Sequence, residues 1–159
     1  MKVVVQRVLE AEVLVDGVSV GRIGRGLALL VGLAIGDDHA DVEWMARKVV
    51  GLRVFDDGAA GGERSVVEIA GEVLAVSQFT LAADCSKGRR PSFDRAMPAA
   101  EAAPLFERFC HALARDVGAV ETGRFGARMH VRTINDGPFT LVIDSPTTRT
   151  STSMREPKL

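Results

Sequence analysis

The chain has 159 residues, 47% of them hydrophobic and 26% charged, with a net charge of −1. This composition predicts one soluble globular domain, and a chain of this size buries about 70% of its unfolded surface. Cys85 and Cys110 are too few for a disulfide scaffold, which favours a reducing cytoplasm. The N-terminus lacks the apolar core of a signal peptide, and the longest apolar stretch, residues 26–36, is about half the length needed to span a bilayer.

The first third of the sequence is rich in β-branched residues. Residues 2–9 form a run typical of a strand, and residues 10–23 alternate apolar and polar side chains on both sides of Asp16-Gly17. An Asp-Gly pair between alternating runs predicts a β-hairpin with a type I′ turn. Residues 27–35 follow as a buried strand.

The hydrophobic period then changes to that of a helix. Asp37 or Asp38 can cap its start, and Gly51 can mark its end. A short strand is expected at 52–55, followed by a glycine-rich surface loop at 56–63.

The second half is expected to contain a long strand at 72–81, a loop at 82–97 and a helix at 99–119. Pro104 is expected in the first turn of that helix, where a missing N–H costs little.

Two alternating segments, 128–134 and 139–144, are predicted to pair with each other across the turn-forming residues 135–138. The polar tail, 145–159, is predicted to be disordered, which leaves 1–144 as a single catalytic domain. The expected fold class is α+β: a mostly antiparallel, barrel-like sheet with about two covering helices.

Side chains that could perform catalysis are few. Ser77 and Thr80 lie at the end of a predicted strand, where hydroxyls are well presented, but three residues apart on a strand they point to opposite faces. A strand that simply ends in small polar residues explains them without any catalytic role. His39, His111 and His130 have no spacing that links them to either hydroxyl, although a triad is assembled in space.

Other classes of site receive less support. The sequence has no ligand spacing typical of a zinc or calcium site, and the glycines at 21–26 precede a strand rather than a helix, so neither a metal nor a cofactor is expected. The basic residues at 86–90 fit a solvated loop or a phosphate contact. Backbone N–H groups at the end of the strand at 72–81 could stabilise an oxyanion.

Four motifs and one shorter match occur in the order and spacing of D-aminoacyl-tRNA deacylases, and the resemblance runs from Met1 to about Asp144. These are QRV (6–8), SQFTL (77–81), KGRRPSF (87–93), TGRFGARM (122–129) and NDGPFT (135–140). The resemblance implies a cytoplasmic homodimer of β-barrel-like subunits, with the site at the subunit interface and no membrane contact. It also implies hydrolysis of the ester that joins a D-amino acid, or glycine, to the 3′ end of tRNA.

The resemblance assigns Ser77, Gln78, Phe79 and Thr80 to the pocket for the terminal adenosine and the reacting ester. Thr80 would be the nucleophile, or the ribose 2′-OH would help to activate water while N–H groups near Phe79 hold the oxyanion. A threonine without a base is a poor nucleophile, which favours the second version.

Gly137 and Pro138 match the Gly-cisPro motif of this family. The resemblance implies that this motif enters the partner subunit's pocket, with its carbonyls facing the substrate's α-amino group and its bulk excluding L side chains. Arg7, Met129 and Asn135 would hold the segment in place.

We further expect Lys87, Arg89 and Arg90 to contact phosphates of the acceptor end. Two stretches depart from the family pattern: residues 61–71, which leave part of the pocket rim undefined, and the tail at 145–159, which has no expected role. A serine or threonine esterase with other substrates and a non-catalytic RNA-binding module remain as alternatives.

Overall fold

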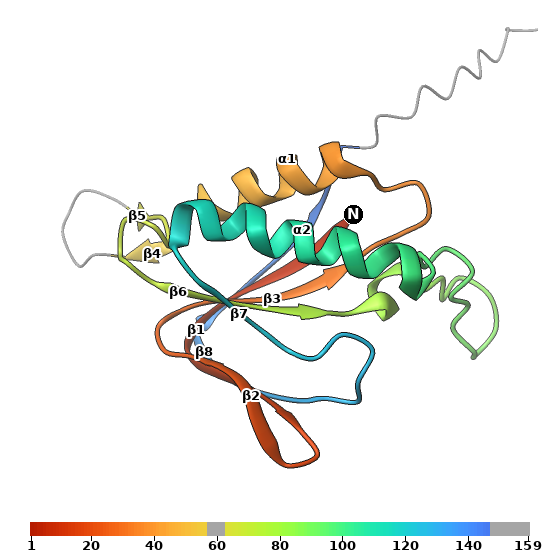
Figure 1. Cartoon of the computed structure of the whole chain (residues 1–159), viewed down its shortest axis with the longest axis horizontal. Helices are drawn as coiled ribbons and strands as arrows, with labels where there is room; N and C mark the ends of the chain where they lie inside the picture. Colours follow the sequence, from red (N-terminus) through yellow and green to blue (C-terminus); the bar gives the residue numbers. More distant parts are fainter. Residues whose placement is uncertain (57–62, 147–159) are drawn as a thin grey trace, which may run out of the picture.

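The computed structural model describes residues 1–56 and 63–146 of the chain. A sheet is covered on one side by two helices (Figure 1). The elements, in chain order, are β1 (Lys2–Val15), β2 (Val18–Ile23), β3 (Gly26–Gly32), α1 (His39–Val50), β4 (Phe55–Asp56), β5 (Glu63–Arg64), β6 (Glu72–Ser77), the 3-10 helix η1 (Phe79–Ala82), α2 (Ala99–Val117), β7 (Val120–Thr122) and β8 (His130–Asp144).

The long strand β1 organises the main sheet. It pairs antiparallel with β2 and β3 on one side and with β8 on the other, and the sheet continues through β6 to β7. The sheet curves until β2 approaches β7, where a side chain on Gly21 would collide with the Thr122 carbonyl. Glycine at this position therefore allows the sheet to close almost into a barrel.

The sheet is mixed, so the expectation of a mostly antiparallel sheet is wrong. β3 pairs parallel with β6, and β6 pairs parallel with β7. Each parallel pair is joined by a connection that contains a helix, α1 in the first case and α2 in the second. Strands that alternate with helical patterns indicate such crossovers, and this signal was present in the sequence.

The predicted hairpin between 128–134 and 139–144 is also wrong. Both segments belong to the single strand β8, which runs antiparallel along β1. Arg7 pairs with Phe139 and Val8 with Asn135, so the three residues Asp136–Pro138 have no partner on β1. We call these three residues the β8 bulge.

Two local predictions are confirmed. Asp16 and Gly17 have φ angles of 51° and 79°, the left-handed values that a type I′ turn requires, and they join β1 to β2. Asp38 caps α1: its carboxylate accepts from the Ala40 and Asp41 N–H groups, and the Asp41 carboxylate accepts from the Asp38 N–H.

Other boundaries differ from those expected. The strand predicted at 52–55 is only Phe55–Asp56, and the one predicted at 72–81 ends at Ser77 and gives way to η1. Pro104 is not in the first turn of its helix, because α2 begins five residues earlier, at Ala99. Within a helix, a proline removes the bond to the carbonyl four residues before it, here that of Ala100.

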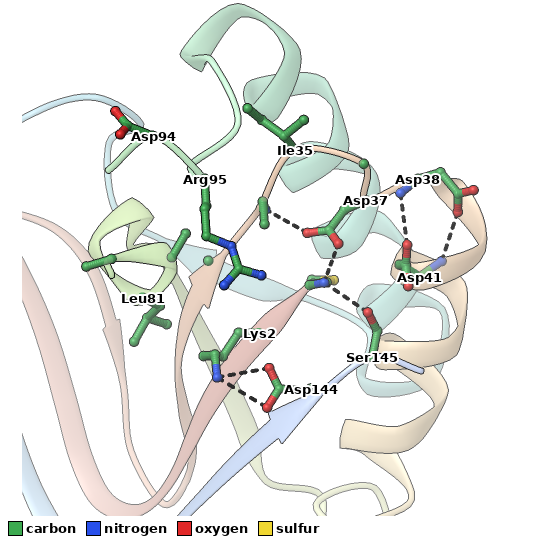
Figure 2. A pocket seen from close by; sticks show the side chains of 16 residues that line it. Lys2, Ile35, Asp37, Asp38, Asp41, Leu81, Asp94, Arg95, Asp144 and Ser145 are labelled. Atoms are coloured by element: carbon green, nitrogen blue, oxygen red, sulfur yellow. Dashed lines mark hydrogen bonds and ion pairs between the residues drawn. The ribbon is translucent and has the colours of Figure 1, made fainter. Parts of the chain in front are cut away.

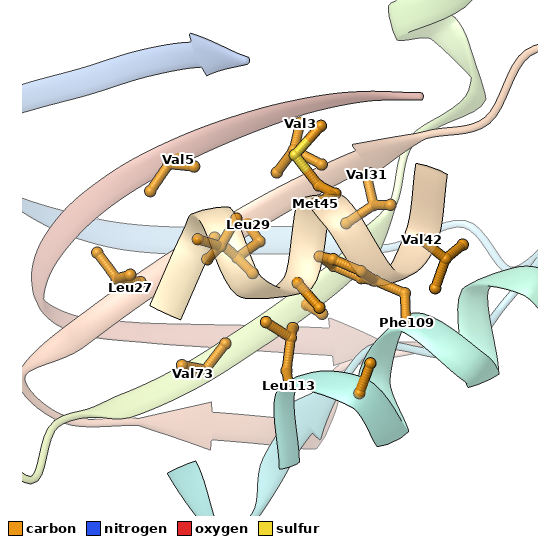
Figure 3. Close-up of a cluster of buried hydrophobic side chains, with 14 of the residues drawn as sticks. Val3, Val5, Leu27, Leu29, Val31, Val42, Met45, Val73, Phe109 and Leu113 are labelled. Carbon is orange, nitrogen blue, oxygen red and sulfur yellow. The ribbon is translucent and has the colours of Figure 1, made fainter. Parts of the chain in front are cut away.

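The main core lies between the sheet and the two helices. Figure 3 shows strand residues such as Leu29 and Val31 facing Met45 of α1 and Phe109 of α2, all of them buried. A smaller cluster around Val13 and other side chains of β1, β3 and β6 fills the concave side of the sheet. The helix-covered face of the sheet therefore buries the larger core, and the opposite face buries the smaller one.

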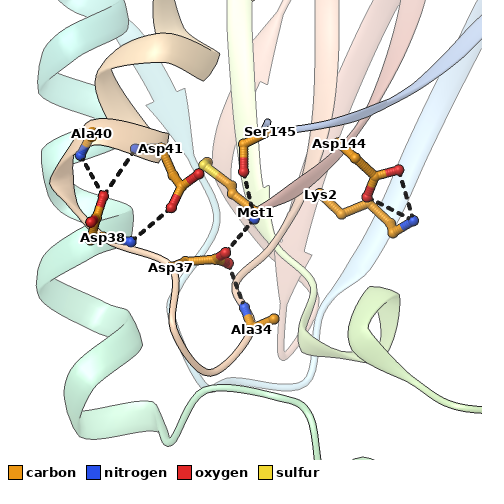
Figure 4. Close-up of polar contacts among 9 residues, drawn as sticks. All are labelled: Met1, Lys2, Ala34, Asp37, Asp38, Ala40, Asp41, Asp144 and Ser145. Carbon is orange, nitrogen blue, oxygen red and sulfur yellow. Dashed lines mark hydrogen bonds and ion pairs between the residues drawn. The ribbon is translucent and has the colours of Figure 1, made fainter. Parts of the chain in front are cut away.

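Polar contacts tie the start of β1 to the end of β8. The Met1 ammonium donates to the carboxylate of Asp37 and, at 2.9 Å, to the hydroxyl of Ser145, as Figure 4 shows. Lys2 pairs with Asp144 at 2.9 Å. Ser145, assigned to the tail from sequence, is buried and belongs to this network, whereas the rest of the predicted disordered tail, 147–159, lies outside the described residues.

No helix within the described ranges is both long and apolar enough to cross a bilayer.

Candidate functional site

The strand β6 ends in a tight turn that carries the SQFTL motif. The Gln78 N–H still donates to the Val31 carbonyl of β3, at 2.7 Å, as if the strand continued. The chain then coils into η1, which we call the η1 turn, closed by the bond from the Leu81 N–H to the Gln78 carbonyl. Thr80 is thus not a strand residue, and the expectation that it points opposite to Ser77 by strand alternation does not hold.

The side chains of this motif are open to solvent. Ser77 and Gln78 are half-buried, while Phe79 and Thr80 are exposed. The Gln78 amide donates to the Thr80 hydroxyl oxygen, so the amide orients the hydroxyl without removing its proton. The N–H groups of Phe79 and Thr80 begin the turn, and the first N–H groups of a helix have no partner within it.

No histidine is placed to act as a base for Thr80. His39 begins α1, His111 is exposed on α2, and His130 pairs with Leu14 at the far end of β1. None of them hydrogen-bonds to Ser77 or Thr80, so a Ser-His or Thr-His pair is not formed among the described residues.

A glycine of β3 determines where the η1 turn lies. A Cβ on Gly32 would stand 2.7 Å from the Cβ of Leu81 and 3.1 Å from the Gln78 carbonyl oxygen. The turn therefore rests directly on the β3 backbone, and any side chain at Gly32 would displace it.

The β8 bulge is held by one largely enclosed cation, Arg7. The Arg7 Nε donates to the Asp136 carbonyl and lies 3.2 Å from the Asp136 carboxylate. The Arg7 Nη1 donates to the Val54 carbonyl, and the guanidinium lies 5.0 Å from the centre of the Phe139 ring. With 17% of its side chain exposed, Arg7 is close to fully enclosed by these four partners.

Within the bulge, the Gly137–Pro138 peptide bond is cis. Gly137 has a φ of 121°, which other residues rarely adopt, and a Cβ there would stand 2.9 Å from the Arg7 Nη2. Pro138 is exposed, as is Gly137. The bulge thus presents backbone and a proline ring to the outside while Arg7 supports it from within.

The other two residues expected to support the bulge differ from Arg7. Asn135 precedes the bulge and pairs with Val8, with its side chain exposed. Met129 packs instead with the smaller hydrophobic cluster and against Gly123. Arg7 therefore makes the direct contacts with the bulge.

The η1 turn and the β8 bulge lie far apart on the sheet. The strand registers connect Phe139 to Arg7, Arg7 to Leu27 and Leu27 to Val73, so the bulge lies level with the start of β6. From Val73 to Ser77 the strand advances about 13 Å, and three strand spacings add about 14 Å across the sheet. Within one subunit the two motifs cannot face the same substrate atom.

The expected basic residues lie on a loop that starts soon after η1. Lys87, Arg89 and Arg90 are all exposed, and none of them forms an ion pair with another residue of the described ranges. The loop is closed by paired backbone bonds between Asp84 and Ser92, at 2.8 and 2.9 Å. We call residues 84–92 the basic loop.

Hydrogen bonds from Ser86 hold the pKa of the Asp84 carboxyl below its usual value, with a smaller contribution from the charge of Arg95. Burial raises the pKa of the Cys110 thiol to about 12, so this cysteine stays a thiol at neutral pH. Cys85 is exposed on the basic loop. A protonated thiol is a poor nucleophile, so Cys110 is not a candidate catalytic residue.

A cavity of about 640 Å³ lies beside the η1 turn, where Leu81 forms part of its wall and Arg95 reaches into it (Figure 2). None of the Ser77–Thr80 side chains lines it. Its carboxylates are already engaged: Asp37 binds the Met1 ammonium, and Asp144 binds Lys2. The cavity therefore does not contain the SQFTL side chains, and its Asp37 and Asp144 carboxylates are not free to bind a ligand.

Three residues that contact Arg7 or Phe79 were not predicted from the sequence. Asp136 and Val54 supply oxygen atoms that hold Arg7, and Phe93 packs edge-on against Phe79 with ring centres 5.2 Å apart. Asp136 and Phe93 lie inside recognised motifs and could have been singled out on that ground. Val54 acts through its backbone, so its side chain carries no such signal.

The described part of the stretch that departs from the family pattern, residues 63–71, begins near the β8 bulge. Residues 61–62 are outside the described ranges, and β5 pairs with β4 beside Val54, whose carbonyl holds Arg7. The turn that follows is closed by reciprocal bonds between Ser65 and Glu68 and buries Val66 in the main core. This stretch thus supports the end of the sheet that carries the bulge.

Comparison with known proteins assigns the family. A family model described as D-Tyr-tRNA(Tyr) deacylase matches residues 4–144. The chain is 50% identical to a D-aminoacyl-tRNA deacylase of Geobacter sulfurreducens, over 96% of this chain and 100% of the relative. It is 51% identical to one of Chlorobaculum parvum, over 92% and 99%, respectively.

Two solved structures share the fold. A c-Myc DNA unwinding element binding protein is 41% identical, with a TM-score of 0.85 over 92% of this chain and 99% of the other. A probable eukaryotic D-amino acid tRNA deacylase is 21% identical, with a TM-score of 0.78 over 89% and 97%, and supports the fold alone. The extent of the family match and of the identity to its curated members shows that this chain belongs to the D-Tyr-tRNA(Tyr) deacylase family.

Proposed function

We propose that this protein is a hydrolase that cleaves the ester between a D-amino acid and the 3′ end of tRNA. The full-length identity to D-aminoacyl-tRNA deacylases supports the reaction and its substrate class. The reaction adds water to the ester carbonyl, passes through an oxyanion and releases the amino acid, leaving the tRNA with its 3′-hydroxyl. It is a cytoplasmic reaction of translation quality control.

The observation that supports a dimeric site is the separation between the η1 turn and the β8 bulge. The η1 turn presents polar groups and leading N–H groups, and the β8 bulge presents the exposed residues Gly137 and Pro138, but the two segments lie far apart on one sheet. A homodimer in which the bulge of one subunit enters the η1 region of its partner would unite them. The exposed apolar side chains of Val131, Ile134 and Val142 on β8 are consistent with a surface that another subunit covers.

In this dimer, Gly137 and Pro138 of one subunit would select the stereochemistry at the other's site. Their carbonyls would receive the substrate's α-ammonium, and their bulk would fill the space that an L side chain needs. D side chains would point away, and glycine, which lacks a side chain, would also be accepted. Selection through the α-carbon substituents leaves the amino-acid side chain unread, so many D-amino acids would be substrates.

For the chemical step, we favour attack by water over attack by Thr80. The Thr80 hydroxyl is bonded to the Gln78 amide, and an amide donor does not remove a proton. Water activated with the help of the terminal ribose 2′-OH would attack, and the N–H groups of Phe79 and Thr80 at the start of the η1 turn would hold the oxyanion. Ser77 and Gln78 would position the ester and the adenosine.

The proposal is tested by release of amino acid from one tRNA charged with D-tyrosine, L-tyrosine or glycine. We expect rapid release of D-tyrosine, measurable release of glycine, and L-tyrosine release no faster than spontaneous hydrolysis. Absence of D-tyrosine release at micromolar enzyme would overturn the hydrolase, and equal release of both enantiomers would overturn the chirality mechanism alone. Sedimentation of the same preparation tests the dimer.

A non-catalytic nucleic-acid-binding role is a second candidate. One solved structure of the same fold, 41% identical, is described as a DNA unwinding element binding protein. On this reading the basic loop would bind nucleic acid with a steep dependence on salt, and no ester would be turned over. A serine or threonine esterase acting on other small substrates is the third candidate. Hydrolysis of a small D-aminoacyl ester that depends on the Thr80 hydroxyl would favour it.

A further inference from the structure

An exposed aromatic pair joins the first residue of the η1 turn, Phe79, to the residue that follows the basic loop, Phe93. Phe79 and Phe93 meet edge to face with ring centres 5.2 Å apart, yet 57% of Phe79 and 40% of Phe93 remain exposed. Neither ring fills a core, so packing does not account for two adjacent phenylalanines at this surface. An open aromatic face is the surface on which an unpaired nucleobase stacks.

The backbone around Phe93 is fixed by several bonds. Its carbonyl accepts from the Ala96 N–H at 2.9 Å, and the next residues form a bridge to the extension of β3, with the Met97 N–H donating to the Leu33 carbonyl at 3.0 Å. On its other side, the paired bonds between Asp84 and Ser92 close the basic loop. The ring is therefore carried on a fixed base.

The charge around the pair favours a polyanion. Lys87, Arg89 and Arg90 stand on the loop that ends beside Phe93, without ion pairs to other described residues. The two carboxylates of this segment are occupied locally, Asp84 with Ser86 and Asp94 with Ser92. The cations are thus available to phosphates, and aromatic rings beside free cations are typical of single-stranded RNA sites.

Resting on the proposed function, we propose that Phe93 stacks the nucleobase that precedes the terminal adenosine of tRNA. Phe79 neighbours Thr80 in the chain and contacts Phe93 in space, and Phe93 directly follows the basic loop, so we take the order to be Thr80, Phe79, Phe93 and then the cations. This order matches a single strand that runs from the ester through the terminal nucleotide to the next base and its phosphates. Phe93 is a substrate-binding residue of the acceptor strand, outside the pocket for the reacting ester.

The central experiment compares two substrates with Phe93→Leu and Phe93→Tyr. One substrate is D-tyrosyl-tRNA and the other is the D-tyrosyl ester of adenosine, which lacks the preceding base. We expect Phe93→Leu to raise KM for the tRNA on the order of tenfold or more, with kcat and the adenosine ester unaffected. Phe93→Tyr keeps the ring face and should restore the KM.

A binding measurement without turnover separates this inference from the proposed function. Fluorescence anisotropy with an uncharged single-stranded RNA that has the tRNA 3′ sequence should show weaker binding for Phe93→Leu at constant salt. Arg89→Gln should weaken binding and reduce its salt dependence, whereas Lys48→Gln on the distant helix α1 should not. If the wild-type protein bound this RNA but hydrolysed nothing, the proposed function would fail while the RNA site remained.

Three results would overturn the inference. An equal loss of activity toward the tRNA and the adenosine ester would show that Phe93 acts by supporting the pocket for the reacting ester. Dissociation of the dimer by Phe93→Leu would assign the aromatic pair to a subunit contact. Unchanged KM and unchanged RNA binding would show that no base stacks there.

Discussion

Midway along β8 the bulge is held by the largely enclosed side chain of Arg7, whereas the η1 turn, just past the end of β6, is held to the sheet mainly through backbone contacts. Arg7 reaches the bulge and the Val54 carbonyl together. The η1 turn is fastened through the Gln78 N–H and its contact with Gly32, while Phe79 and Thr80 remain exposed. In the proposed dimer this difference would have a use: the bulge would keep a fixed shape at the partner's site, and the η1 turn would stay open to receive the ligand.

The largest effect is expected from removing the contacts that Arg7 makes with the β8 bulge. Arg7→Met keeps the length of the side chain but leaves the Asp136 and Val54 carbonyls without their donor, which costs about 2–4 kcal/mol of unfolding free energy. Displacement of the bulge should also lower kcat/KM for D-tyrosyl-tRNA on the order of 10²-fold. Thermal unfolding and steady-state hydrolysis measure the two effects.

Arg7→Lys is the matched variant. Lysine retains the charge, but its single ammonium cannot reproduce the planar guanidinium that donates to the Asp136 and Val54 carbonyls together. We therefore expect this variant to remain less stable and less active than the wild type. Arg132→Met removes an exposed arginine that is paired with Glu12 across the sheet, and it should change stability by less than about 1 kcal/mol. Full activity in Arg7→Met would show that the bulge keeps its position without this cation.

The second prediction concerns the position of the η1 turn. Gly32→Ala would place a methyl group 2.7 Å from Leu81 and push the η1 turn away from β3. We expect a loss of about 1–3 kcal/mol in stability and a fall in kcat of about tenfold or more. Gly51→Ala, at a helical φ of −87° at the end of α1, is the control and should retain activity. A wild-type kcat in Gly32→Ala would mean that the turn's position does not limit the reaction.

A milder change tests the chemistry of the open segment. Thr80→Ala removes the hydroxyl but leaves the backbone N–H groups of the η1 turn in place. If water attacks the ester, kcat should stay within about threefold of the wild type. Complete loss of D-tyrosine release would identify the hydroxyl as the nucleophile and reverse the mechanism proposed above.

The smallest effect is expected from a contact that touches neither segment. The hydrogen bond from Arg115, with the charges of Arg115 and Arg108, lowers the pKa of Glu43 below its usual value of 4.5 and links α1 to α2. A lowered folded-state pKa gives stability that is present above the unfolded pKa and lost as the pH falls through the folded value. Glu43→Gln should therefore melt slightly earlier than the wild type at pH 7, with a difference that shrinks below about pH 4. A constant difference across this range would assign the effect to packing.

Elements defined by local chemistry could be predicted from the sequence. The turn at Asp16-Gly17 and the cap at Asp38 depend on residues within a few positions, and both are present. The β8 bulge could not be predicted in the same way. Its turn-forming residues suit a hairpin equally well, and only the pairing with Arg7 and Val8, far away in the chain, decides between them.

The candidate site likewise combines features that could be predicted from the sequence with features that could not. The motif residues were identified through their resemblance to a family, and the structure shows how they lie. The contact between Arg7 and the Val54 carbonyl and that between Gly32 and Leu81 join residues far apart in the chain, which no local pattern encodes. The assumption that β6 continues through Thr80 failed because Gln78 keeps a strand bond while the next residue begins a helical turn.

The β8 bulge also affects how this protein can associate through its sheet. β8 pairs only with β1 among the described strands, so its other side is a free edge fifteen residues long. Such edges invite uncontrolled pairing with other chains, and a proline without an N–H inside an unpaired bulge interrupts the run of donors near its middle. The residues proposed to discriminate between stereoisomers would therefore also protect the protein against aggregation.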